Sequence, residues 1–549
     1  MLELRVPRSA RKPTGRTQVK IGWHLEGTVA SIARVGPRAA LIAVCLAIPA
    51  YVFLLLNDAM LHGGVGYDEC WFLWSGWCFL KGLAPYVDFL EFRPPFVFLT
   101  HALALKLHGF DGFRYRYFFC YFPLGALVAA HASLISRGVD KILSMALMIG
   151  FTCLFVNPMY HDTALSDSES IGLSYYLFGV AFLLAKTRFR TAFDILGGAF
   201  LLACAESKEP FIPCVFATWI ACSFAQGADW SGRSFPRAHL LKYFKNTAVG
   251  GLIVVALLCV YMVPTGSMKQ YLLTVKGYFT IFRDTSKSYC VLLGRFKPTT
   301  RWNDLMVQWD QARREFLNAP NLSYLFPFAA STMVITLRRN PALFVCASVA
   351  AFFGLFAVTA SNCQWVHYYN MTMTGLFFFL AIGLDALSPF MRSGTVLLRM
   401  FLRLTIGGLV ILHVWPRLDA ERTAFGSRTF GNPYVEAVPG VFKIVAENTT
   451  PTDRIFTTGM PNLYVQTNRI SAVRESVFVD EMMGFYTGDT DEERFRPIYE
   501  QLKQHMPKVF ILDPEYGARK TRHNQGLFIP FLTAEHYKQL TPNIYLRPY

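Results

Sequence analysis

The 549-residue chain has few charged residues: only 16% are Asp, Glu, Lys or Arg, against about 25% in an ordinary soluble domain. Apolar residues make up 53% of it, and the mean hydropathy is +0.31. This composition excludes a disordered protein and a coiled coil, and it argues against a soluble enzyme. It predicts a protein that crosses a membrane several times.

The sequence also lacks paired cysteines. It has twelve cysteines, most of them inside apolar runs, and none forms a CxxC pair. A zinc ribbon and a disulfide framework are therefore excluded, and we expect most of these cysteines to be buried as small apolar side chains. Internal repeats and low-complexity tracts are absent as well.

The charges that are present are unbalanced, because 53 Lys and Arg face 37 Asp and Glu, a net charge of +16. A basic excess is typical of proteins that meet nucleic acid, anionic lipid or anionic substrates. Here the basic residues are spread over a tail at 1–38 and short connections between apolar runs. We therefore predict no nucleic-acid partner and interpret the excess as a membrane-topology signal.

Eleven apolar runs approach the ~20 residues that a membrane-spanning helix needs. They are Ala39–Leu56, Tyr117–Ile135, Ile142–Val156, Ile171–Ala185, Ala192–Ala205, Phe211–Ala225, Ala248–Val263, Leu325–Leu337, Leu343–Ala360, Met371–Leu387 and Val396–Trp415. The basic tail is too long for the start of a signal peptide, so we expect the first run to stay as an anchor. Pro94–Leu107 opens with two prolines and carries His101 and Lys106, and we expect it to lie along the membrane surface.

Eleven spans make every second connection basic, as the positive-inside rule requires. The N-terminus is then cytoplasmic, the region 39–415 is membrane-embedded, and 416–549 is extracytoplasmic. Outer loops are expected at 57–107, 157–170, 265–321 and 361–370. The outer C-terminal region is polar, and helix-like and strand-like stretches predict a small α/β domain: Tyr434–Glu447, Glu492–Met506, Arg454–Thr457, Lys508–Leu512 and Ile544–Arg547.

Asp68 and Glu69 lie in the first outer loop among Tyr67, Trp71 and Trp74. Partial burial beside aromatic rings makes a carboxylate a better general base. The alternative is an aromatic belt at the membrane interface with incidental acids. The sequence favours neither interpretation from these residues alone.

Three further outer segments carry polar side chains. Asp167 and Glu169 precede an apolar run, where acids also cap helices. His367 and Tyr368 precede another, where such residues also anchor a helix at the interface. Lys208 lies in a charged corner between two runs, where a solvated loop charge is the alternative.

The predicted topology places these groups on one side of the membrane: Asp68, Arg93, Asp167, Glu169, Lys208 and His367. Cations that meet acids at the edge of a bilayer suit a reaction between a lipid-borne phosphate and a second substrate from outside. The cations hold the phosphate, and a carboxylate takes a proton from the nucleophile.

The first outer loop, from Tyr67-Asp68-Glu69 through Leu83–Phe89 to Arg93-Pro94-Pro95, resembles that of GT-C glycosyltransferases. The similarity is to bacterial members of the protein mannosyltransferase and aminoarabinose transferase clan. It continues through Lys208-Glu209-Pro210 and His367-Tyr368-Tyr369, and it extends to the small outer domain. The resemblance implies surface helices in the first loop and location in a bacterial inner membrane.

The resemblance also implies an activity. Such enzymes move a sugar from a polyprenyl-phosphate carrier to a glycan, lipid or protein acceptor on the outer face, with inversion. Asp68 is then the base and Glu69 supports it or a helper divalent cation, although no metal site is predicted. Arg93 binds the donor phosphate, helped by His367, Tyr368 and Lys208. Asp88, Asp167 and Glu169 orient substrates.

Two other functional classes fit a polytopic protein. A transporter or flippase for a lipid-linked sugar predicts ionisable residues near mid-span and repeated halves, and the sequence has few of the first and none of the second. A non-catalytic assembly subunit would bind a partner through the outer domain, and the acids and cations argue against it.

Overall fold

The computed structural model describes residues 44–45, 47–54, 67–110, 114–155, 166–227, 237–283, 306, 310, 333–357, 369–408, 440–459, 461–475, 491–512, 526 and 528–548. Two predicted site residues, His367 and Tyr368, lie outside these ranges, as do the basic tail 1–38 and most of the predicted loop 265–321 beyond residue 283.

Apolar helices form the predicted membrane region. They are α5 (Tyr115–Ser136), α6 (Lys141–Phe155), α7 (Ser168–Leu184), α8 (Arg190–Ala205), α9 (Phe211–Gly227), α10 (Arg237–Met262), α15 (Pro341–Ala357) and α16 (Tyr369–Ser393). Residues 47–54, 333–339 and 396–408 are helical too. Every predicted apolar run therefore coincides with a helix wherever the structure describes it.

The number of membrane crossings stays a prediction. Among the described residues, three helices are long and apolar enough to cross a membrane: Tyr115–Ser136, Ala238–Met262 and Met371–Ser393. Three shorter apolar helices accompany them: Ser168–Leu184, Phe211–Gln226 and Pro341–Ala357. These helices support an integral membrane protein, but they do not establish eleven spans.

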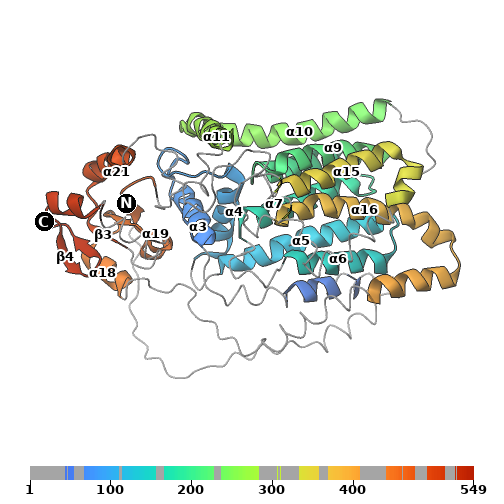
Figure 1. Cartoon of the computed structure of the whole chain (residues 1–549), viewed down its shortest axis with the longest axis horizontal. Coiled ribbons are helices and arrows are strands. Elements are labelled where there is room, and N and C mark those ends of the chain that lie inside the picture. The colour runs from blue at the N-terminus through green and yellow to red at the C-terminus, as the bar shows by residue number, and fades with distance from the viewer. Residues whose placement is uncertain are drawn as a thin grey trace, which may run out of the picture. The chain divides into compact units, whose positions relative to one another are not determined.

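Helix α7 lies inside the bundle, packed against α5, α8, α9 and α16 (Figure 1). Glycines allow the helices to approach closely, as in other membrane bundles. A Cβ on Gly198 of α8 would lie 2.2 Å from the Thr247 carbonyl oxygen of α10, and one on Gly250 would lie 1.9 Å from that of Ile195. Helix α10, in contrast, exposes Leu252, Leu257 and Val260 along one side, as expected for a lipid-facing helix.

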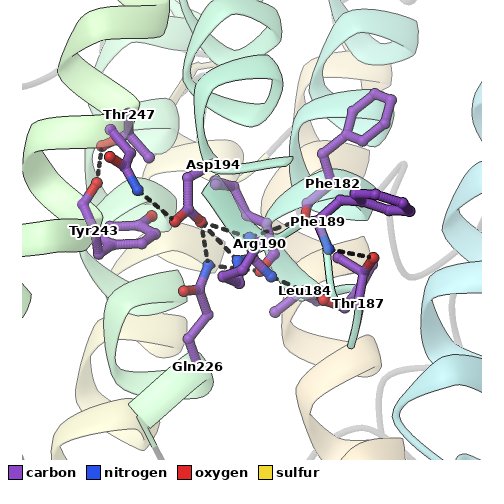
Figure 2. A network of polar contacts seen from close by, with 12 residues as sticks. Phe182, Leu184, Thr187, Phe189, Arg190, Asp194, Gln226, Tyr243 and Thr247 are labelled. Atoms are coloured by element: carbon purple, nitrogen blue, oxygen red, sulfur yellow. Dashed lines mark hydrogen bonds and ion pairs between the residues drawn. The ribbon is translucent and has the colours of Figure 1, made fainter. Parts of the chain in front are cut away.

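Polar networks join the helices at the end that the predicted topology places in the cytoplasm. Figure 2 shows Asp194 at the centre of one of them. Its Oδ1 accepts hydrogen bonds from Arg190 Nη2 at 2.6 Å and Gln226 Nε2 at 3.1 Å, and Oδ2 accepts one from Asn246 Nδ2 at 3.2 Å. The network connects α8, α9 and α10, and it neutralises a buried acid.

A second network at this end is centred on Arg137, directly after α5. Its Nε donates to Asp385 of α16 at 2.6 Å, and its Nη atoms donate to the carbonyl oxygens of Leu184 and Ala225. Both buried aspartates in these networks are therefore paired with arginines, Asp194 with Arg190 and Asp385 with Arg137 at the end of α5. These two aspartates therefore do not support a substrate path through the middle of the bundle.

The segment predicted as the first outer loop contains two packed helices, α3 (Tyr67–Leu80) and α4 (Pro95–His108). Gly76 allows their contact, because a Cβ there would lie 2.7 Å from the backbone nitrogen of Ala102. Proline at the first position favours a helix start, and α4 begins at Pro95. At ~1.5 Å per residue its 14 residues span about 21 Å, less than a bilayer core of ~30 Å. This length agrees with a surface helix.

Helix α11 (Ser267–Arg283) follows α10, where the sequence predicted only a loop. Tyr271 explains its position, since its ring lies 5.2 Å from that of Tyr86 and its hydroxyl donates to Glu206 Oε2 at 3.0 Å. This helix was not predicted because its apolar residues form only one narrow face.

The C-terminal region contains a five-stranded sheet in the order β2-β1-β3-β5-β4. The strands are β1 (Arg454–Thr457), β2 (Ile470–Ser471), β3 (Val509–Ile511), β4 (Lys538–Thr541) and β5 (Ile544–Leu546), and the helices are α18 (Val441–Asn448), α19 (Asn462–Thr467) and α21 (Asp491–His505). Strand β1 pairs in parallel with β2 and β3, while β5 pairs antiparallel with β3 and β4. An α/β fold is therefore observed, with α19, β2 and β4 in addition to the predicted elements.

Alternate residues of the strands pack into two apolar clusters, as the two-residue period of a strand requires. Ile455 and Val509 belong to a cluster with Tyr464 of α19, while Phe456 and Phe510 belong to one with Phe528. Tyr464 also lies 6.1 Å from the ring of Trp74 on α3. The sheet therefore shares an apolar core with the first outer loop.

Candidate active site

Glu69 is fixed by an ion pair in the first turn of α3. Its Oε1 accepts from Arg116 Nε at 2.8 Å and from the Tyr115 hydroxyl at 2.7 Å, and its Oε2 accepts from Arg116 Nη2 at 2.8 Å. Only 2% of Glu69 is exposed. A bidentate, buried pair of this kind holds α3 against α5, which suits the supporting role predicted for Glu69.

Asp68 precedes Glu69 but has different surroundings. It is half-buried, and no described residue donates a hydrogen bond to its carboxylate. Its negative charge acts on the buried Asp167, at the start of α7. The two acids are therefore within electrostatic range of each other, although 99 positions separate them in the sequence.

Asp167 is a buried acid with an unused acceptor. Burial raises its pKa well above the usual range, and the charges of Asp68, Glu169 and Glu69 raise it further, while Lys208 opposes the shift. Its Oδ1 has no hydrogen-bond partner in the described ranges, and it makes no capping bond to α7. A side-chain cap thus does not explain this acid, and water, an ion or a substrate can supply the partner that a buried polar atom requires.

Glu169 and Lys208 form a buried ion pair between α7 and the corner that joins α8 to α9. They are 1% and 2% exposed, so Lys208 is not a solvated loop charge. Glu169 Oε2 also accepts from the Ser168 hydroxyl at 2.8 Å. The ammonium group of Lys208 thus pairs with Glu169, and its positive charge also acts on Asp167.

His101 of α4 supports the segment before Asp167. Its Nε2 donates to the Ser166 carbonyl oxygen at 2.9 Å, because a carbonyl can only accept. Burial lowers the pKa of His101 to about 4, so the ring is neutral at physiological pH. The rings of Phe119 and Phe72 pack around it at 4.6 and 5.8 Å. His101 therefore links α4 to the start of α7.

Arg93 lies between α3 and α4, and 8% of it is exposed. Its positive charge lowers the pKa values of Glu91 and Glu209, but burial dominates and raises both. Glu209 belongs to the same corner as Lys208, whose charge acts on it in the same way. Arg93 and Lys208 are therefore both within electrostatic range of Glu209 in this corner.

Asp88 is exposed and fixes its own loop. Its Oδ2 accepts from the Ala84 backbone nitrogen at 2.8 Å, across the turn that contains Tyr86. No contact with the acids described above is observed for it. The predicted role of Asp88 in orienting a substrate stays a prediction.

The structure thus brings together Asp68, Glu69, Asp167, Glu169 and Lys208, with Arg93 near the same corner. Sequence reasoning missed their partners Arg116, His101, Glu91 and Tyr86. Arg116 sits in an apolar helix, where an unpaired cation is costly, and this was the one signal available. The others carry no local pattern that separates them from packing residues.

No group of three or more His, Cys, Asp or Glu side chains suited to a metal ion occurs among the described residues. A helper divalent cation therefore receives no support from this part of the chain. Its presence stays an expectation of the family resemblance.

Comparison by sequence finds no family and no curated relative for this chain. None of the protein-family models matches the chain. None of the curated proteins matches it either.

Solved structures do match it. ArnT from Cupriavidus metallidurans bound to undecaprenyl phosphate has a TM-score of 0.52 and 14% identity, over 92% of this chain and 98% of ArnT. The apo state of that ArnT gives 0.52 and 13%, over 93% and 98%. The Archaeoglobus fulgidus oligosaccharyltransferase in the apo form gives only 0.47 and 11%, over 87% of this chain and 70% of that one. The chain therefore shares the fold of ArnT, a GT-C protein, over most of its length, and the predicted resemblance is confirmed at the level of the fold.

Proposed function

We propose that the protein is a glycosyltransferase that moves a sugar from a polyprenyl-phosphate carrier to an acceptor on the outer face of a bacterial inner membrane. One observation carries the proposal: two acids from different predicted loops, Asp68 and Asp167, are within electrostatic range of each other, and Asp167 is within range of Lys208. The ArnT-like fold supports it, since the ArnT structure holds undecaprenyl phosphate. The acceptor is a glycan, a lipid or a protein.

Asp68 is the base in this proposal. It accepts the proton of an acceptor hydroxyl, whose oxygen then forms a bond to the anomeric carbon. The bond between that carbon and the phosphate oxygen breaks, and the configuration inverts. Asp68 suits this step better than Glu69 because its carboxylate is half-buried, whereas both oxygens of Glu69 are engaged by Arg116.

The leaving polyprenyl phosphate keeps its negative charge, and a preorganised cation stabilises it as the bond breaks. Arg93 fills this role, because its guanidinium can bind two phosphate oxygens at once. His367 and Tyr368 are proposed to assist. Lys208 contributes less, since Glu169 already neutralises it.

Asp167 is proposed to orient a substrate. Its unused Oδ1 offers a hydrogen-bonding site that a sugar or acceptor hydroxyl can fill. Glu169 keeps Lys208 beside it. The C-terminal domain, proposed to be extracytoplasmic, packs on α3 through Tyr464 and Trp74 and steadies the helix that carries Asp68.

Binding of undecaprenyl phosphate to the purified full-length protein tests the donor class. Native mass spectrometry should detect one molecule per protein chain, and Arg93→Ala should reduce the occupied fraction. Equal retention of a neutral polyprenol would contradict a phosphate-dependent site. A flippase would translocate the lipid-linked sugar across vesicles without an acceptor, whereas a transferase would release free polyprenyl phosphate only when an acceptor is present.

A further inference from the structure

Glu91 is a completely buried acid in the turn before Arg93. Its Oε1 accepts from the backbone nitrogens of Phe92 at 2.9 Å and Arg93 at 3.0 Å, while its Oε2 accepts from the Ser75 hydroxyl at 2.8 Å. Ser75 belongs to α3, the helix that begins with Asp68. The carboxylate therefore fastens the backbone of Arg93 to the helix of the proposed base.

Tyr86 holds the other side of the same residue. Its hydroxyl donates to the Arg93 carbonyl oxygen at 2.8 Å, and only 1% of Tyr86 is exposed. Its backbone has φ of +63°, a left-handed conformation that is uncommon and strained for a bulky residue. Such strain is retained where the surrounding structure holds it, and it gathers at functional sites.

The turn is fixed on its following side as well. Pro94 and Pro95 have restricted φ angles because of their rings, and Pro95 begins α4. The nitrogen and the carbonyl oxygen of Arg93 are thus both held by buried side chains, next to two rigid residues. A long, flexible side chain gains most from a fixed backbone when it must meet a ligand in one geometry.

We propose that Glu91, with Ser75 and Tyr86, positions Arg93 for the phosphate of the lipid donor. This inference rests on the proposed function, in which Arg93 meets that phosphate. Glu91 itself touches neither substrate. Its contribution is to hold the Arg93 backbone so that the guanidinium is placed before the donor arrives.

Another possible role of Glu91, as a counter-charge to Arg93, predicts a different change in phosphate affinity. If Glu91 acts as a counter-charge to Arg93, its neutralisation strengthens phosphate binding. If it acts as a backbone acceptor, Glu91→Gln keeps most of the affinity, since the amide oxygen still accepts both N–H groups and the amide nitrogen donates to Ser75. Glu91→Ala then weakens binding, because all three bonds are lost.

The test measures the Kd of undecaprenyl phosphate for the purified full-length protein. We expect Glu91→Ala to weaken binding about tenfold, the effect of losing hydrogen bonds to a charged group. Ser75→Ala and Tyr86→Phe should weaken it less, and Glu91→Gln should stay within about threefold of the wild type. Ser174→Ala is the matched control for Ser75→Ala, since Ser174 is also buried but bonds only to its own helix.

A double-mutant cycle decides between positioning and general damage. Glu91→Ala combined with Arg93→Ala should bind no more weakly than Arg93→Ala alone. Additive losses, or unchanged binding in Glu91→Ala, would overturn the positioning role. If Glu91→Ala does not fold, Tyr86→Phe combined with Arg93→Ala completes the same cycle with one oxygen removed. If Arg93→Ala binds as the wild type does, the proposed phosphate role fails and the positioning role fails with it.

Discussion

The carboxylate of Glu69 receives Nε and Nη2 of Arg116, each at 2.8 Å, while the neighbouring Asp68 is half-buried and receives no hydrogen bond from a described residue. Two adjacent acids in one helical turn thus have different surroundings. Glu69 joins α3 to α5, and Asp68 is the proposed base. The ion pair between Glu69 and Arg116 holds the helix that carries Asp68, and Asp68 takes no part in that pair.

Replacing one member of that pair should destabilise the protein. Glu69→Gln leaves the buried Arg116 without its counter-charge, at a cost of about 3–5 kcal/mol. We expect a clear fall in the melting temperature of the purified protein. The double variant Glu69→Gln, Arg116→Gln should recover part of the loss, because neither side then buries a charge alone. A single variant that melts with the wild type would contradict this role.

Arg93→Ala should raise the KM for the lipid donor more than it changes the KM for the acceptor. Loss of a charged hydrogen bond to phosphate costs about 1.5–3 kcal/mol, or roughly 10- to 100-fold in affinity. Lys81→Ala is the matched control, since Lys81 is an exposed cation after α3 that lies over the ring of Trp77. A donor titration that gives both variants the same KM would refute the role of Arg93.

Asp167→Asn should reduce transfer without loss of stability. Burial raises the pKa of Asp167 and so favours its neutral form, and a neutral amide of similar shape fits its place. The amide replaces one carboxyl oxygen by an NH2 group and so changes the hydrogen bonds offered to a substrate, and the transfer rate should fall about 2- to 10-fold, the effect of one lost neutral hydrogen bond. Parallel melting curves and rate measurements check this. A lower melting temperature with full activity would make Asp167 structural.

Glu91 gives a pH dependence whose sign can be stated. Burial raises its pKa from 4.5 to about 7, against opposing hydrogen bonds from Arg93, Ser75 and Phe92 and the charge of Arg93. The folded protein then binds this proton more tightly than the unfolded chain, so stability decreases as pH rises from about 4.5 to about 7. The change is about 3 kcal/mol at most. Melting temperatures across this range should fall more for the wild type than for Glu91→Gln, and parallel curves would contradict the shift.

The sequence was sufficient for much of the fold. The apolar runs coincide with helices, since a span must satisfy its backbone internally and be apolar throughout. Strand β1 was predicted with its observed ends, Arg454–Thr457. Strand β4 was missed because Lys538 and Gln539 lie exposed at the sheet edge and show no apolar alternation. Helix α19 was missed because six residues are too few to show a helical period.

The candidate site was predictable only in part. The predicted topology alone placed Asp68, Asp167 and Lys208 on the same side of the membrane, because the order of the spans decides on which side each loop lies. Their distances to one another could not follow from it, because these depend on how α3, α7 and the corner at Lys208 pack. Arg116 and Glu91 were missed for this reason: each is defined by a partner that is distant in sequence or by the backbone of a turn.

The central claim is that Asp68 is the base of a sugar transfer from a lipid phosphate. Mass spectrometry of lipid-linked sugars and surface glycans in a strain lacking this gene, complemented with the wild type or with Asp68→Asn, tests it most directly. We predict that one sugar is missing from the surface and its lipid-linked form accumulates, both without the gene and with Asp68→Asn. A general base contributes about 10²- to 10⁴-fold in rate. Full restoration of the surface glycan by Asp68→Asn, produced at the wild-type level, would contradict the account.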